Sequence, residues 1–572
     1  MTWQGLLQIA IFVVVLFLLT KPVGIYLSKV FNAEKTFLDP LLSPVERLIY
    51  RLCGIKAYEE QTWSRYALST LTFSFFGFAL LMLLLMLQGI LPFNPQNYGH
   101  FSWDQAFNIA VSFMTNTNWQ SYAGETSLSY FSQMVGLTVQ NFVSAATGIA
   151  VAIALVRGLV RRSSHTIGNF WVDLTRATLW VLLPLCIILT LVYVQQGTPQ
   201  NLQPAVTANT LEGTQQIIAQ GPVASQEAIK SVGTNGGGFF NANSSHPYEN
   251  PTPLTNFLQM LSIFIIGTGL VYAFGRMAGN EQQGWAILKA MAILFIIGLG
   301  IMYYAEGHSP LLAHLPVDTT PSELQAGGNM EGKEVRFGIV NSVLYSEVTT
   351  AASNGGINSN LDSYTPMGGM IAMINMGMGE IIIGGVGSGL YTILLYTILA
   401  LFLAGLMVGR TPEFLGKKIE AKEMKMVMIA LLAPPLCVLS FTALACLTKA
   451  GLAGPSTSGP HGFSQILYGY LSATVNNGSA FAGLNANTPF YNVTTALCML
   501  IGRFLVILPV LALAGSLVQK KCVPVSEGTF PTTGTLFVAL LLGVIFIVVG
   551  LSLFPAITLG PIAEDLFLRA NK

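Results

Sequence analysis

Four short polar segments, each between two long apolar runs, constrain the fold of this chain more than any other feature. They are rich in Asn, Gly, Ser and Thr, and each follows a helical segment too short to cross a bilayer. The segments cover residues 115–120, 234–238, 352–356 and 475–479. Non-helical backbone at membrane depth is tolerated only where it lines a water-filled path or is buried in protein. One such segment would be read as an ordinary surface turn, but four predict a pore built from quasi-equivalent loops.

The composition supports a membrane setting. Of the 572 residues, 52% are hydrophobic and only 9% are charged, whereas soluble domains carry roughly 25% charged residues. The formal net charge of +1 gives no reason to expect nucleic acid as a partner. The six cysteines form no CxxC pair, so we interpret them as small buried hydrophobic residues. The first apolar run, residues 6–19, is interpreted as a retained span rather than a signal peptide.

The apolar runs predict an all-α polytopic membrane protein with about ten transmembrane helices. A span needs roughly 20 mostly apolar residues, and such runs are centred near residues 14, 77, 144, 185, 264, 295, 395, 437, 503 and 544. Most of the 27 Lys and Arg residues lie in every second connection, while the four polar segments lie in the others. Because cytoplasmic loops retain basic residues, the polar loops are predicted to enter from outside. Both termini are then predicted to be extracytoplasmic.

The predicted organisation is one leading span, four repeats of span, pore helix, loop and span, and one trailing span. Each repeat contains an even number of crossings, so all four can surround one axis along the membrane normal and form a pseudo-fourfold pore. The leading span with its cytoplasmic loop covers residues 1–65. The pore repeats cover 66–156, 172–275, 286–409 and 426–517, and the trailing span covers 534–572.

The segments before the polar loops are predicted to be pore helices. They cover Trp103–Met114, Ser225–Val232 and Ser464–Thr474 in the first, second and fourth repeats, each with a serine at its start. Every pore helix ends at its loop, so the negative end of its dipole favours a cation at the pore centre.

Glycines follow at the same place in three loops, as Gly236, Gly355 and Gly478. We expect them to adopt the left-handed backbone that turns carbonyls inward. Asn118 occupies this place in the first loop, and Asn tolerates left-handed geometry better than other residues with a side chain.

The loops contain no ring of Asp or Glu, which favours coordination of a cation by backbone carbonyls. None of them reads TVGYG, so we expect fewer ordered ion sites than in a tetrameric potassium channel. The predicted cation-binding residues are Thr115, Asn116, Thr117, Asn118, Thr234, Asn235, Gly236, Ser353, Asn354, Gly355, Asn476, Asn477 and Gly478. The predicted supports of this filter are Gln120, Gly237, Gly238 and Gly356.

Two further features are predicted to lie below the filter. The second span of the third repeat contains Glu380 and four glycines, Gly384, Gly385, Gly387 and Gly389. A nucleotide site would need a βαβ unit or a GK[ST] sequence, and neither is present. We therefore interpret this segment as an unwound gate. Arg503 lies within a span of the fourth repeat and is predicted to pair with Glu380; the alternative is that it snorkels to the cytoplasmic side.

Several motifs resemble the KdpA family, the potassium-binding subunits of the bacterial Kdp potassium-transporting ATPase. The resemblance spans essentially the whole chain and is carried by residues 115–120, 225–230, 234–247, 329–334, 384–391, 409–413 and 476–481. It implies the fold of the superfamily of potassium transporters and potassium as the ligand. It also implies a bacterial inner-membrane location and delivery of extracellular potassium through an intramembrane tunnel to KdpB, a P-type ATPase subunit. KdpC and KdpF are the other implied partners.

The sequence agrees with a non-catalytic role, because it has no DKTGT phosphorylation motif, no Walker lysine loop and no large soluble domain for ATP. Two alternatives stay open. One is a self-sufficient channel or ion-coupled transporter of the Trk/Ktr/HKT type. The other is a membrane enzyme that uses Glu380, Arg503 and the outer histidines, which are His246, His308, His314 and His461.

Overall fold

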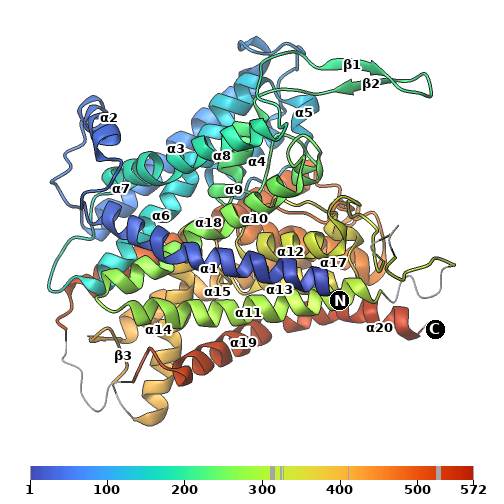
Figure 1. The fold of residues 1–572 in the computed structure, drawn as a ribbon. Helices are drawn as coiled ribbons and strands as arrows, with labels where there is room; N and C mark the ends of the chain where they lie inside the picture. The colour runs from blue at the N-terminus through green and yellow to red at the C-terminus, as the bar shows by residue number, and fades with distance from the viewer. Residues whose placement is uncertain are drawn as a thin grey trace.

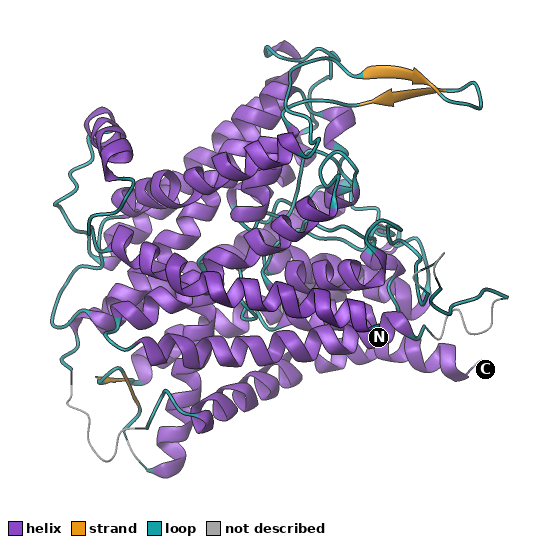
Figure 2. Cartoon of the chain, in the orientation of Figure 1, coloured by secondary structure: helices purple, strands orange, loops and turns teal. Residues whose placement is uncertain are grey.

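Long apolar helices dominate the computed structural model of the chain (Figures 1 and 2). The structure describes residues 2–309, 316–322, 325, 327–409, 411–522 and 530–570; His314 and Arg410 lie outside these ranges. Among the described residues, ten helical segments are long and apolar enough to cross a membrane. The predicted all-α class and number of spans are thereby confirmed. Figure 1 shows both termini at one end of the bundle, as an even number of spans requires.

Each predicted span centre falls within one of these ten segments. In chain order they are α1 (Trp3–Phe31), α3 with η1 (Trp63–Ile90), η2 with α6 (Ser132–Val160), α7 with η3 and α8 (Phe170–Gln195), α10 (Pro253–Met277), α11 (Glu281–Gly307), α14 (Ser388–Val408), α15 (Ala421–Leu447), α18 (Pro489–Gln519) and α19 with η6 and α20 (Thr535–Ala570). Within them, α6 covers Val139–Val160, α7 covers Phe170–Arg176, η3 covers Ala177–Leu182, α8 covers Leu183–Gln195 and α20 covers Ala563–Ala570.

The helix that follows the filter loop begins in the same way in three repeats. Thr252, Thr365 and Thr488 are N-caps, and each is followed by a proline in the first turn. Each threonine hydroxyl accepts a hydrogen bond from the backbone N–H three residues later, at 3.1–3.3 Å. Proline suits this place because its missing N–H would have no intrahelical partner. This Thr-Pro pair recurs in three repeats and is a signal of the repeats that can be seen in the sequence.

The four pore helices are α4 (Trp103–Met114), α9 (Val223–Val232), α12 (Gly338–Ala351) and α17 (Gly459–Thr474). The bounds of α4 agree with the prediction, but the predicted starts of α9 and α17 are wrong. The first turn of α9 is reached by Gln200, whose Oε1 accepts from the N–H of Ser225 at 2.9 Å. In α17, Ser464 lies inside the helix and donates to the carbonyl of Pro460 at 3.0 Å. Long-range contacts and a first-turn proline therefore start these helices earlier than their serines indicate.

The second span of the third repeat is broken, as the glycine-rich segment predicted. Helix α13 (Pro366–Gly377) ends there, and α14 begins at Ser388, so residues 378–387 are not helical. Four residues of this segment have left-handed φ, including Glu380 at 63° and Ile383 at 50°. Positive φ at a β-branched residue costs free energy and persists only where the surroundings enforce it.

Two small antiparallel hairpins and several short helices, among them α2, accompany the spans in the described part of the chain. Strands β1 (Val206–Asn209) and β2 (Gln215–Ile218) form a hairpin between α8 and α9 that projects from the bundle (Figure 1). Strands β3 (Glu413–Phe414) and β4 (Lys417–Lys418) lie at the opposite end, between α14 and α15. Helix α2 (Asp39–Leu52) lies between α1 and α3.

Buried ionic and hydrogen-bonded contacts fasten the helices together at the end that carries β3 and β4. Arg157 of α6 binds Asp173 of α7 through Nη1 and Nη2, at 2.6 and 2.9 Å. The hydroxyl of Tyr66 also donates to Asp173, at 3.0 Å. Lys417 donates to the carbonyls of Gly158 and Leu517, both at 2.8 Å. It therefore supplies hydrogen bonds to carbonyls in the last turns of α6 and α18, where no intrahelical donor is available.

Replacing Asp173 tests the Arg157 contact. We expect Asp173→Asn to destabilise the protein by about 3–5 kcal/mol, because it leaves a buried guanidinium without its counter-charge. The control Glu60→Gln removes the half-exposed pair with Arg161, at 2.8 Å, and should cost about 1 kcal/mol or less. Thermal unfolding of both variants in detergent measures the difference. Equal losses of unfolding free energy in the two variants would show that the buried Arg157–Asp173 contact stabilises the fold no more than the half-exposed pair does.

Candidate functional site: a four-loop filter

The four pore helices end in one shared backbone geometry. The second residue after each helix has left-handed φ: Asn116 at 71°, Thr234 at 48°, Ser353 at 55° and Asn476 at 59°. The N–H of the next residue then donates to the carbonyl five residues earlier, at 2.9–3.0 Å. These bonds run from Thr117 to Ser112, Asn235 to Lys230, Asn354 to Thr349 and Asn477 to Ser472. They resemble the 6→1 bond of a Schellman cap. Four loops distant in sequence are therefore equivalent in backbone.

The predicted role of the loop glycines is only partly correct. Gly478 has left-handed φ, at 98°, as does Asn118, at 56°, but Gly236 and Gly355 do not. The left-handed turn is made two residues earlier in every loop. Gly236 is needed for close approach instead, because an added Cβ would collide with the carbonyl oxygens of Thr117 and Asn477. A Cβ at Gly355 or Gly478 would likewise collide with backbone atoms, so the backbones of these three loops are closely packed at this level.

The amide side chains of the loops bind neighbouring repeats. Asn235 Nδ2 donates to Asn116 Oδ1 at 2.8 Å, which joins the second loop to the first. The equivalent Asn354 and Asn477 donate to the carbonyls of Lys230 and Thr349 in the preceding pore helices, both at 3.1 Å. These side chains fix the spacing of the loops and leave carbonyls available for an ion.

The first and fourth loops are joined differently. Thr117 occupies the place of the three asparagines, and its Oγ1 accepts from Asn476 Nδ2 at 2.8 Å. This substitution breaks the exact fourfold equivalence of the loops. Asn118 Nδ2 in turn donates to Asn141 Oδ1 of α6, at 2.5 Å. Asn141 was not among the predicted site residues.

The predicted supports lie beside the second loop. Gln120 accepts from the N–H of Gly238 at 3.2 Å and donates to its carbonyl at 3.0 Å. A Cβ at Gly237 would collide with the Asn118 carbonyl, and one at Gly356 would lie 3.2 Å from Lys230 Cε. Gln120 therefore holds the backbone of the second loop, and the two glycines permit close packing around it.

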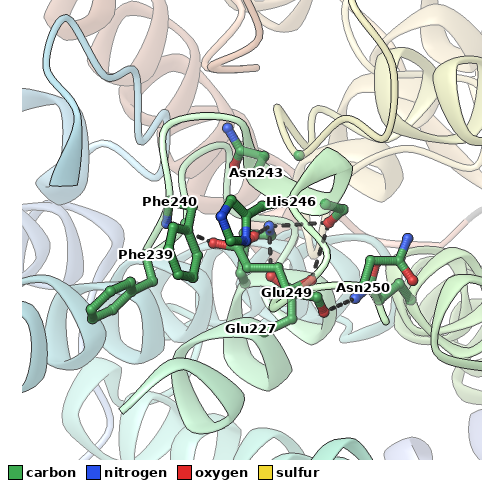
Figure 3. Close-up of polar contacts among 12 residues, drawn as sticks. Glu227, Phe239, Phe240, Asn243, His246, Glu249 and Asn250 are labelled. Atoms are coloured by element: carbon green, nitrogen blue, oxygen red, sulfur yellow. Dashed lines mark hydrogen bonds and ion pairs between the residues drawn. The ribbon is translucent and has the colours of Figure 1, made fainter. Parts of the chain in front are cut away.

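A buried ionic cluster behind the second loop was missed in the sequence. Lys230 of α9 lies 2.6 Å from Glu227 Oε2 and 2.7 Å from Glu249 Oε2, and all three side chains are buried (Figure 3). Glu249 also accepts from the N–H of Phe240 at 2.8 Å, and His246 stacks on the Phe240 ring at 3.7 Å. Charges on a short helix at membrane depth demand partners, and this was the signal available in the sequence.

Below the filter, Glu380 and Arg503 line one cavity with Ser388, Tyr391 and Asn476. The predicted direct pair between Glu380 and Arg503 is wrong, because the two form no ion pair in the described part of the chain. Glu380 is hydrogen-bonded by the hydroxyl of the filter residue Ser353. Arg503 Nη2 donates to the carbonyl of Ser144 on α6, at 2.9 Å. Arg503 is only 6% exposed, so it does not snorkel.

The broken segment of residues 378–387 is wedged beneath the loops. The N–H of Val386 donates to the hydroxyl of Thr234 at 3.0 Å. A Cβ at Gly387 would collide with the Gly148 carbonyl of α6, and one at Gly267 of α10 would lie 2.7 Å from the Gly384 carbonyl. The segment is thus packed between α6 and α10 and tied to the second loop.

Among the histidines that the structure describes, none lines the cavity of Glu380 and Arg503. His461 of α17 lies between Asp362 Oδ1 at 3.2 Å and Glu564 Oε1 of α20 at 2.9 Å. These hydrogen bonds raise the pKa of His461 to about 10, so it carries a charge at neutral pH and links α17 to α20. The described residues contain no group of three His, Cys, Asp or Glu side chains suited to a metal ion.

The sequence and the fold were compared with those of known proteins. The family model KdpA, described as "Potassium-transporting ATPase A subunit", matches residues 10–566. A Methylorubrum extorquens relative is 59% identical over 565 residues, covering 99% of this chain and 98% of the relative. A Brucella anthropi relative is 60% identical over 567 residues, covering 99% of each. Both are named potassium-transporting ATPase potassium-binding subunit.

A similar fold occurs in the potassium transporter TrkH from Vibrio parahaemolyticus, with a TM-score of 0.51 and 14% identity over 86% of this chain and 96% of that one. At this identity the likeness concerns the fold alone, and it agrees with the arrangement of pore-loop repeats. The family match and the relatives cover nearly the whole sequence. The chain therefore belongs to the KdpA family, the A subunits of potassium-transporting ATPases.

Proposed function

We propose that this chain is the non-catalytic, potassium-binding subunit of an ATP-driven potassium uptake complex in the bacterial inner membrane. It selects extracellular potassium and delivers it through an intramembrane tunnel to the P-type ATPase subunit KdpB, with KdpC and KdpF as the other partners. ATP binds elsewhere in the complex. Both termini face outward, and the repeats cover residues 66–156, 172–275, 286–409 and 426–517. The names of the relatives support potassium as the ligand.

The observation that carries this proposal is the shared left-handed cap of the four loops. It ends four pore helices around one centre, where their dipoles favour a cation. Carbonyls can replace the hydration shell of potassium at such a centre. We assign the ligands to the backbone of residues 115–118, 234–236, 353–355 and 476–478. The asparagine side chains then act as spacers that keep these carbonyls apart.

Beneath the filter, we assign the route to the cavity that contains Glu380 and Arg503. Glu380 supplies negative charge to a potassium ion leaving the loops. Arg503 and the packed segment 384–389 oppose straight passage to the cytoplasm. A protein that feeds a pump needs such a block, because an open pore would let accumulated potassium flow back.

The rival function is a self-sufficient potassium channel or ion-coupled transporter, which the TrkH-like fold favours. The two functions differ in their need for ATP hydrolysis. Under our proposal, concentrative potassium uptake requires the co-expressed ATPase subunit and stops when the phosphorylated aspartate of that subunit is replaced. Uptake by this chain alone would support the rival.

A first prediction concerns the close approach at Gly236. We expect Gly236→Ala to weaken potassium binding by tenfold or more, equivalent to about 1.4 kcal/mol, since its Cβ would collide with the Thr117 and Asn477 carbonyls. The control Gly99→Ala introduces a Cβ with no heavy atom within 4 Å and should leave binding unchanged. Potassium dependence of ATPase activity in the purified complex measures the effect. Unchanged affinity in Gly236→Ala would remove the second loop from the filter.

A second prediction concerns the tie between the filter and the broken segment. Thr234→Val is nearly isosteric but lacks the hydroxyl that accepts from Val386, so the segment should loosen and potassium should leak without ATP. Thr234→Ser keeps the hydroxyl and serves as the control. Passive rubidium flux into vesicles containing the assembled complex is measured for both. If the valine variant assembles and is no leakier than the serine variant, Thr234 does not hold a gate.

A third prediction concerns Glu380. Glu380→Gln keeps the shape of the side chain and removes its charge, so delivery to the ATPase should slow several-fold at limiting potassium. The preference of the filter for potassium over sodium should persist, because the loops are unchanged. Wild-type turnover at limiting potassium would exclude Glu380 from the route, whereas lost selectivity would place it in the filter itself.

A further inference from the structure

Helix α2 has an apolar face that no described part of the chain covers. The exposed fractions of Leu41, Val45, Leu48 and Leu52 are 69%, 41%, 53% and 76%. At 100° per residue, the spacing i, i+4, i+7, i+11 places these four side chains in one narrow stripe along the helix. Phe37, just before the helix, is 81% exposed. This exposed ring lies 5.6 Å from the ring of Tyr26 on α1, between centroids.

A different side of α2, about a quarter to a third of a turn from the stripe, is fixed to the bundle. Leu42 and Glu46 are buried, and Glu46 Oε1 lies 2.8 Å from Nε of Arg176. The hydroxyl of Tyr50 also donates to Glu46, at 2.5 Å. Because these contacts set the rotation of α2 about its axis, the stripe must point away from the protein.

The position of α2 is that of a helix at a membrane surface. Figure 1 shows it at the margin of the bundle, at the end opposite the termini, lying across the direction of the spans. Only residues 32–38 connect it to α1, and only residues 53–62 connect it to α3. At about 3.5 Å per residue, the shorter connection reaches no more than roughly 25 Å. Helix α2 is therefore confined to the region where these two spans leave the membrane.

The exposed charges of α2 are positive, whereas its two carboxylates are half-buried or buried. Asp39 accepts from the N–H and the hydroxyl of Thr36, at 3.1 and 3.0 Å, and Glu46 is paired with Arg176. Arg47 and Arg51 are exposed and lie beside the apolar stripe on the helical wheel. An apolar stripe bordered by arginines is typical of a helix that lies in the plane of an acidic membrane surface.

We propose that α2 is a membrane-surface helix that inserts Leu41, Val45, Leu48 and Leu52 into the acyl boundary and binds acidic phospholipid headgroups through Arg47 and Arg51. The stripe should lie about 5–10 Å into the boundary between headgroups and chains. Its pairing with Arg176 then holds the start of the fourth span, α7–η3–α8, at a fixed depth. This inference does not depend on the transport role of the chain.

A fluorescent probe on Leu48→Cys tests the contact in the assembled complex. Cys53 is the exposed native cysteine and is first changed to serine, since the other five are buried or half-buried. The complex is reconstituted in vesicles of phosphatidylcholine and phosphatidylglycerol at 7:3, with bromine on the chains of one lipid or the other. We expect lipid bromine to quench the probe and aqueous iodide to spare it. A probe on Glu34→Cys, an exposed residue of the linker, should show the reverse.

The same probe measures the charge selectivity. Each arginine near an acidic surface should enrich phosphatidylglycerol about fivefold, from roughly 1 kcal/mol per charge. Brominated phosphatidylglycerol should therefore quench more per molecule than brominated phosphatidylcholine. In the Arg47→Gln/Arg51→Gln variant, the ratio of quenching per molecule by brominated phosphatidylglycerol to that by brominated phosphatidylcholine should fall close to one. The matched control Lys422→Gln/Lys425→Gln removes two exposed charges at the same end of the bundle and should keep the original ratio.

Three outcomes would overturn the proposal. Quenching by iodide and not by lipid would place the stripe in water. Protection of the probe from both lipid bromine and aqueous iodide would mean that a partner subunit covers the stripe. Equal quenching by the two lipids, unchanged in the Arg47→Gln/Arg51→Gln variant, would show an apolar contact without recognition of acidic headgroups.

Discussion

Backbone groups that leave helices at membrane depth must find partners inside the protein, and the filter is organised around this requirement. In each loop one left-handed residue lets the next N–H bond back to the pore helix. This cap ends the helix abruptly and turns the following carbonyls away from its axis. The loops can then meet with backbone rather than side chains at the centre, which is the arrangement that carbonyl coordination of a cation needs.

Symmetry in the backbone is combined with asymmetry in the side chains. Asn235, Asn354 and Asn477 each reach the preceding repeat, but Thr117 takes their place in the first loop and receives a bond from the fourth. The ring of loops is closed by a different contact at this one junction. A single chain can tune each loop separately, whereas a homotetramer repeats one sequence four times. The same freedom permits the break in the third repeat without disturbing the others.

Several buried charges join helices or loops to one another in this fold. Lys230 is held by two carboxylates behind the second loop, and Lys417 donates to carbonyls at the ends of two helices. Arg503 differs from them in position, because it lines the cavity below the loops, although it too donates to a backbone carbonyl.

Local sequence determined the features that depend on local physics. Runs of about 20 apolar residues predicted ten spans, the serine that precedes Trp103 predicted the start of α4, and the glycines of residues 384–389 indicated the broken helix. The left-handed backbone of Asn118 was also predictable from its residue type. The tertiary structure decided what depends on contacts between distant segments. The start of α9, the tight approach at Gly236, the identity of the partners of Lys230 and the separation of Arg503 from Glu380 belong to this second group. Their causes lie in the neighbours that the fold supplies, which no local pattern in the sequence specifies.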